Sequence, residues 1–86
     1  MGKLEKLLVR ILSGVSDSNI NFNLLCKLVV YLGFDERIKG DHFIYTKQDV
    51  DEIINLQPLG SKAKPYQVKQ VRNIIVKYCL GEINAK

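Results

Sequence analysis

The fold is decided by a stretch in the middle of the chain, Phe34-Asp35-Glu36-Arg37-Ile38-Lys39-Gly40-Asp41-His42-Phe43-Ile44-Tyr45-Thr46. Its two halves, residues 34–39 and 42–46, are short and rich in β-branched and aromatic residues, which is typical of β-strands. Gly40-Asp41 between them is a hairpin signal, because a two-residue turn needs a positive φ that glycine adopts without steric cost. The sequence therefore predicts that the two strands pair.

A third strand is expected over residues 52–57, where an apolar run is stopped by Pro58. Residues 48–51 before it are polar and acidic. The start of this strand is also compatible with a helical turn, so the residues alone leave its first position open.

Two helices are predicted before the hairpin. Apolar residues at three- and four-residue intervals form one stripe of an opening helix that Gly14 ends: Leu4, Leu7, Leu8, Ile11 and Leu12. A polar turn over residues 15–19 follows, and Asn21 is placed to cap the second helix through its side-chain oxygen. Gly33 is expected to end that helix as a left-handed residue. Its buried face is predicted to contain Phe22, Leu25, Leu28, Val29 and Leu32.

One further helix is predicted after the strands. Residues 59–64 suggest a flexible basic loop, and Pro65 suits the first turn of a helix, where its missing N–H breaks no bond. The apolar stripe of this helix contains Val68, Val71, Ile75 and Tyr78. The order of elements predicts one α+β domain over residues 1–86, with an antiparallel three-stranded sheet and its helices on one side.

Size and charge restrict the partner. At 86 residues the chain has a modest core and little room for a deep pocket, so we expect a shallow site that suits a polymer better than an enclosed metabolite. The net charge is +4, and residues 53–80 carry five basic side chains and no acidic one. Clustered cations favour a polyanion, either nucleic acid or an acidic protein surface, although an ordinary solvated helix face has the same composition.

Cysteine use and hydropathy bear on location. Cys26 and Cys79 fall in apolar helical patterns and are expected to be buried thiols in a reducing compartment, and no zinc-ligand spacing is present. The longest apolar run, residues 28–32, is far shorter than the ~20 residues that span a bilayer. The start of the chain lacks the apolar region of a signal peptide. We therefore expect a cytoplasmic protein that needs no metal or other cofactor.

His42 is the single histidine and the candidate catalytic residue. Imidazole gains and loses a proton near neutral pH, and RNA can be cleaved by its own 2′-hydroxyl when a base, an acid and cations are supplied. One histidine fills one of the two proton-transfer roles. The other group is left open between a lysine, Tyr45, water and a second subunit. Asp41 is the neighbour expected to raise the pKa of His42.

The cations around the last predicted helix are the candidate RNA-binding residues. Backbone N–H groups and the dipole at a helix N-terminus favour phosphate, and Lys62 and Lys64 lie beside the start of this helix. Lys69 and Arg72 are three residues apart and share a face. Among the aromatic residues, Tyr31 and Tyr78 are expected in the core, whereas Tyr45 and Tyr66 are open candidates for stacking on bases. The predicted phosphate contacts are Lys39, Gly40, Lys62, Lys64, Lys69 and Arg72.

Over residues 22–80 the chain resembles the HicA-type toxins, small bacterial ribonucleases of toxin–antitoxin pairs. The resemblance rests on Leu32-Gly33-Phe34, on Lys39-Gly40-Asp41-His42 with Phe43-Ile44-Tyr45, and on Lys64-Pro65-Tyr66-Gln67-Val68 with Val71 and Ile74-Ile75. The family has a Gly-Ser-His turn, so Gly40 and His42 match whereas Asp41 departs. Residues 1–18, the opening helix and its loop, lie outside the common core.

The resemblance implies a fold like that of the double-stranded RNA-binding domain, with an extra N-terminal helix here. It also implies metal-independent cleavage of mRNA with His42 as the catalytic residue, and inhibition by a HicB-like antitoxin that covers the site. Two alternatives stay open from the residues: a non-catalytic RNA-binding module of the same fold, and a protein-interaction module with an acidic partner. The oligomeric state is also open.

Overall fold

A computed structural model describes residues 2–82 of the chain as a small α+β domain. The elements, in chain order, are α1 (Lys3–Ser13), the 3-10 turn η1 (Asp17–Asn19), α2 (Phe22–Tyr31), β1 (Asp35–Lys39), β2 (His42–Lys47), β3 (Val50–Leu56), β4 (Pro58–Leu59), β5 (Lys62–Ala63), α3 (Pro65–Lys77) and the 3-10 turn η2 (Leu80–Glu82). The predicted α+β class and order of the main elements are confirmed.

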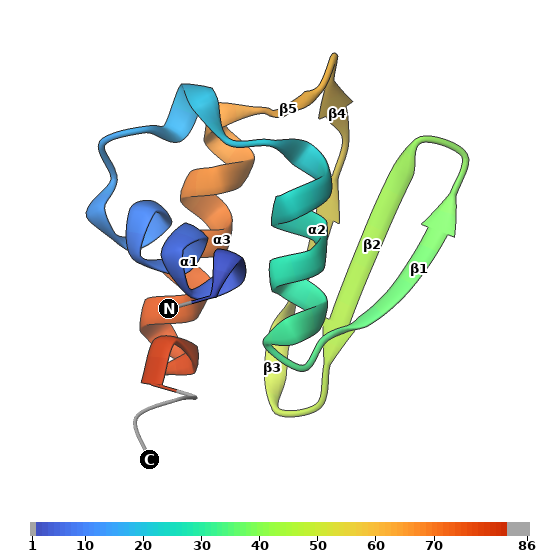
Figure 1. Ribbon diagram of the computed structural model, residues 1–86. Coiled ribbons are helices and arrows are strands. Elements are labelled where there is room, and N and C mark those ends of the chain that lie inside the picture. The colour runs from blue at the N-terminus through green and yellow to red at the C-terminus, as the bar shows by residue number, and fades with distance from the viewer. Residues whose placement is uncertain (1, 83–86) are drawn as a thin grey trace.

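The main sheet is antiparallel with the strand order β1-β2-β3. The predicted hairpin is present: Lys39 lies opposite His42, and Gly40 between them has a φ of +63°. Within residues 2–82, all three α-helices lie on one side of this sheet and leave its other face uncovered (Figure 1). The predicted placement of the helices on one side is therefore confirmed.

Two connections differ from the prediction. Strand β3 begins at Val50 rather than at residue 52, because Gln48-Asp49 forms a second two-residue turn in which Asp49 has a φ of +73°. Aspartate tolerates this left-handed conformation better than most residues because its side chain is short and polar. The predicted loop over residues 59–64 is instead a short hairpin of β4 and β5, which turns at Gly60.

The predicted helix ends are confirmed. Gly14 has a φ of +74° and its N–H donates to the carbonyl of Ile11 at 3.1 Å, which ends α1. The Asn21 side chain accepts a hydrogen bond from the N–H of Leu24 at 3.0 Å and caps α2. Gly33 has a positive φ after α2, and Pro65 occupies the first turn of α3. These signals are local, so the sequence alone was sufficient to place them.

The core lies between the helices and the covered face of the sheet. Residue Tyr45 of β2 is completely buried there, with Ile54 and Leu56 of β3 beside it and apolar residues of all three helices around it. Cys26 is buried as predicted, whereas the same prediction for Cys79 is wrong. Helix α3 ends at Lys77 and Cys79 has a φ of +57°, so its side chain leaves the apolar stripe of the helix. No helix within residues 2–82 combines the length and apolar character needed to span a membrane.

Candidate functional site

The candidate site is centred on His42, the first residue of β2. Its neighbour Phe43 packs against the core, so the alternation of the strand turns His42 to the uncovered face of the sheet. The side chain is 48% exposed, and its Nδ1 lies 3.3 Å from Oδ1 of Asn55 on the adjacent strand β3. Lys39 of β1 is directly opposite His42 in the register. The imidazole is thus accessible, held on one side by an amide oxygen, and next to a cation.

Asp41 lies on the other side of the imidazole. Its Oδ1 is 3.6 Å from Nε2 of His42, and its Oδ2 accepts a hydrogen bond from Nε2 of Gln57 at 3.1 Å. This hydrogen bond from Gln57 is the main reason that the pKa of Asp41 is lowered. The turn position of Asp41 therefore lets it face His42, although adjacent residues in a regular strand would point apart.

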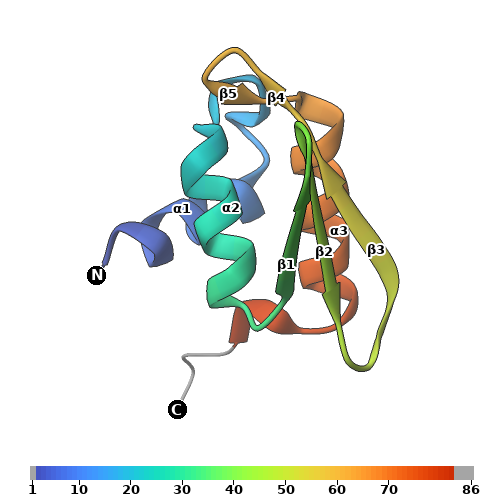
Figure 2. The same ribbon diagram turned by 90° about the vertical axis from the view of Figure 1, so that its right-hand side faces the viewer.

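Gln57 extends the contacts of this site to the start of α3. Its Oε1 accepts a hydrogen bond from Nζ of Lys64 at 3.1 Å, and its backbone N–H donates to Oε1 of the buried Gln67 at 3.1 Å. The turn between β1 and β2, the β4–β5 hairpin and the start of α3 lie at the same end of the molecule (Figure 2). Lys64 is thereby held near His42, although 22 positions separate them in the sequence.

Asn55, Gln57 and Gln67 were not identified from the sequence. Each is an uncharged amide without a recognisable motif, and its role depends on the pairing of strands and helices. The register provides the signal that was missing: Ile44 lies opposite Asn55, which places Asn55 on the same face as His42.

At the start of α3, the side chain of Lys64 is the main group available to bind a phosphate. Pro65 has no N–H, and the N–H of Gln67 already donates to the carbonyl of Lys64 at 2.9 Å. Few of the free backbone N–H groups that usually bind an anion at a helix N-terminus are therefore available here.

The remaining predicted phosphate contacts lie toward η1. Nζ of Lys62 donates to Oδ1 of Asn19 at 2.5 Å, and Lys69 is exposed on α3, where its charge contributes to the lowered pKa of Asp17. Arg72 forms a two-pronged ion pair with Asp17 at 2.8 and 3.0 Å and also donates to the carbonyl of Ile11. Because its guanidinium is occupied in this way, we exclude Arg72 from the candidate interface.

The tyrosines divide by burial. Tyr45 is fully buried and its hydroxyl donates to Oε2 of Glu36 at 2.7 Å, so it can neither stack on a base nor reach a substrate. Burial raises the pKa of Tyr45, which further opposes a role in proton transfer. Tyr66 is 65% exposed beside Lys64 and remains open to contact with a base. The half-buried Tyr31 and Tyr78 pack against the core as predicted.

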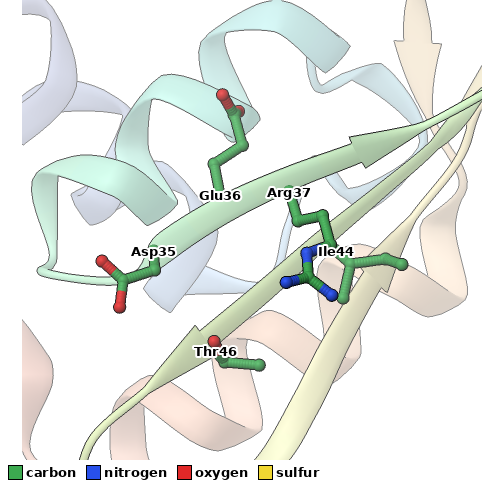
Figure 3. A pocket seen from close by; sticks show the side chains of 5 residues that line it. All are labelled: Asp35, Glu36, Arg37, Ile44 and Thr46. Atoms are coloured by element: carbon green, nitrogen blue, oxygen red, sulfur yellow. The ribbon is translucent and has the colours of Figure 1, made fainter.

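A hollow of about 380 Å³ lies farther along the sheet, over β1 and β2. The side chain of Arg37 extends over β2 toward Ile44 and Thr46, whereas Glu36 points to the opposite, helix-covered side (Figure 3). His42 and Lys64 do not line this hollow. We therefore place the candidate site at His42, where titratable and cationic groups meet, rather than at this hollow.

Among the side chains that the structure describes, no group of three or more His, Cys, Asp or Glu is arranged to hold a metal ion. No protein-family model, curated protein or solved structure matches this chain.

Proposed function

We propose that the protein is an endoribonuclease, the toxin of a toxin–antitoxin pair, in which His42 acts as general acid or base on mRNA. The observation that carries the proposal is an accessible imidazole held between Asn55 and Asp41, with Lys39 opposite it and Lys64 linked to it through Gln57. A titratable group flanked by cations on an open sheet face is suited to a phosphodiester in a polymer.

The geometry supports a specific first step. With its proton on Nδ1, His42 donates a hydrogen bond to Oδ1 of Asn55, and the lone pair on Nε2 is then available to take a proton from a 2′-hydroxyl. The resulting alkoxide attacks the adjacent phosphorus, a 2′,3′-cyclic phosphate forms, and the bond from phosphorus to the 5′-oxygen breaks as that oxygen takes a proton from water. The ammonium groups of Lys39 and Lys64 stabilise the charge that develops on the phosphate oxygens. We propose that this cleavage is metal-independent.

The order of elements supports the proposed relationship to the HicA-type toxins. Apart from the short β4–β5 hairpin, the succession α2-β1-β2-β3-α3 matches the α-β-β-β-α order of the double-stranded RNA-binding domain, and α1 is an additional N-terminal element. In this proposal a HicB-like antitoxin inhibits the protein by covering His42 and the neighbouring cations.

A non-catalytic RNA-binding module is the second candidate, and one observation favours it. Among the described residues, the polar neighbours of His42 are carboxylate, amide and ammonium groups, none of which ordinarily titrates near neutral pH. The second proton-transfer group is therefore absent from the immediate surroundings of the imidazole, and water or the RNA itself has to serve.

Incubation of mRNA with the purified protein in excess EDTA tests the proposal. We expect His42→Ala to lower the cleavage rate by about 10²-fold or more, the usual contribution of a general acid or base. Lys47→Ala, at the other end of β2, is the matched control and should cleave like the unaltered protein. Circular dichroism establishes that each variant is folded.

Binding without cleavage by the unaltered protein would favour the RNA-binding module. Equal cleavage by both variants and the unaltered protein would show that His42 is not the catalytic residue.

A further inference from the structure

Helix α1 carries a cationic stripe of its own. Lys3, Lys6 and Arg10 are spaced three and four residues apart, so they lie on one face of the helix. Together with Leu7 and Leu24 they line a shallow groove of about 190 Å³ between α1 and α2. Neither Lys3 nor Lys6 has a hydrogen-bond or ion-pair partner among the side chains that the structure describes. The groove thus presents two unneutralised ammonium groups beside a guanidinium.

Contacts at Asn19 connect this groove to the β4–β5 hairpin. A guanidinium nitrogen of Arg10 donates to the backbone carbonyl of Asn19 at 3.1 Å, and Nζ of Lys62 donates to its side-chain oxygen. The two cations therefore meet at one residue, although 52 positions separate them in the sequence. The cations of α1 and of β5 are thus brought together at η1.

A chain of side-chain contacts connects the end of β5 to His42. Ala63 is buried, so the extended backbone of β5 turns Lys62 and Lys64 to the opposite, outer side. Lys64 is linked through Gln57 and Asp41 to His42. Two carboxylates lie on or beside this path: Asp41, which is next to His42, and Asp17, which is paired with Arg72. Most charges along the path are thus positive, which suits the negatively charged phosphodiester backbone of RNA.

We propose that α1 extends the RNA-binding surface, so that an RNA strand engaged at His42 continues over Lys62 and places its phosphates against Lys3, Lys6 and Arg10. This inference rests on the proposed function and adds the extent of the substrate to it: the protein takes a strand long enough to cover both regions. Contacts to phosphates position such a strand without reading its sequence.

The test compares RNA of two lengths, both 2′-O-methylated so that cleavage through the 2′-hydroxyl cannot occur. One has about 4 nucleotides and the other about 16, the range of site sizes that small single-strand-binding domains cover. The Lys3→Gln/Lys6→Gln variant removes two charges from the groove and keeps Arg10, which contacts the backbone. Lys27→Gln/Lys47→Gln, two exposed or half-exposed lysines that do not line the groove, is the matched control.

For the long RNA, we expect Lys3→Gln/Lys6→Gln to weaken binding and to reduce the slope of log K against log salt by about 0.7 per lost phosphate contact. The short RNA should bind the variant as it binds the unaltered protein, and the control should bind both like the unaltered protein. An unchanged slope for the long RNA, with retained binding of the short one, would overturn this inference and leave the proposed function standing.

Two other outcomes also decide the question. Failure of the unaltered protein to bind either RNA would overturn the proposed function and this inference together. If Lys3→Gln/Lys6→Gln binds the long RNA with unchanged affinity but no longer binds an acidic protein encoded by a neighbouring gene, the groove is assigned to a protein partner instead.

Discussion

At the scale of single residues, the position of a side chain on a strand decides whether it is accessible to a substrate or packs in the core. His42 and Tyr45 both belong to β2 and both were candidates for proton transfer, yet His42 faces the open side of the sheet and Tyr45 the core. The hydroxyl of Tyr45 satisfies its hydrogen bond with Glu36, and Cys26 lies close enough to contribute to its raised pKa. The role that fits Tyr45 is stabilisation of the fold.

Replacement of Tyr45 by phenylalanine tests this role. We expect Tyr45→Phe to lower the free energy of unfolding by about 1 kcal/mol, because one hydrogen bond is lost while the aromatic packing is kept. RNA cleavage by the folded protein should be unchanged. Urea denaturation gives the first quantity and the cleavage rate the second. A cleavage defect in a variant of nearly full stability would return Tyr45 to the catalytic mechanism.

At the scale of elements, polar contacts fasten the end of α3 to β3. Oε2 of Glu52 accepts a hydrogen bond from Nζ of Lys77 at 2.8 Å, and its Oε1 accepts one from the hydroxyl of Tyr78 at 2.7 Å. The bond from Lys77, followed by that from Tyr78, lowers the pKa of Glu52 from 4.5 to about 2. This part of the packing between helix and sheet therefore depends on an ionised carboxylate.

The lowered pKa of Glu52 predicts acid sensitivity. Because its pKa is lower in the folded state than in the unfolded state, its contribution to stability is complete above pH 4.5 and is lost as the pH falls toward about 2. Melting temperatures measured across this interval should fall more steeply for the unaltered protein than for Glu52→Gln, which cannot titrate. Parallel curves for the two proteins would refute this assignment.

At the scale of the whole molecule, Arg72 joins three segments that are distant in the chain. From α3 it reaches Asp17 in η1 and the backbone carbonyl of Ile11 in α1, and its side chain is only 17% exposed. Buried residues of α1, including Ile11, complete the attachment of this helix to the core. The N-terminal helix α1 is therefore integrated into the domain.

Substitution of Arg72 measures this attachment. We expect Arg72→Met, which keeps an apolar stem, to lower the free energy of unfolding by about 2 kcal/mol through the loss of charge-assisted hydrogen bonds. Lys69→Met, one turn earlier on the exposed surface, should change it by less than about 0.5 kcal/mol. Thermal and urea unfolding give both values. RNA affinity of folded Arg72→Met should match that of the unaltered protein, and a large loss would restore Arg72 as a phosphate contact.

The sequence by itself determined the features that depend on neighbouring residues. The turn at Gly40, the cap at Asn21, the ends of the helices and the place of His42 at the start of β2 follow from backbone preferences and from hydrophobic periodicity, which act within a few residues. These features were sufficient to predict the α+β order and the candidate catalytic residue.

The tertiary structure alone decided which side chains meet. Asp17 and Arg72 are 55 positions apart, and Asp41 and Gln57 are 16 apart, so no local preference could pair them. The same packing pairs Arg72 with Asp17 and leaves Cys79 exposed beyond the end of α3. It also brings Asn55, Gln57 and Lys64 close to His42. Such contacts depend on how strands and helices are brought together in space, because their free energy arises between elements rather than within one.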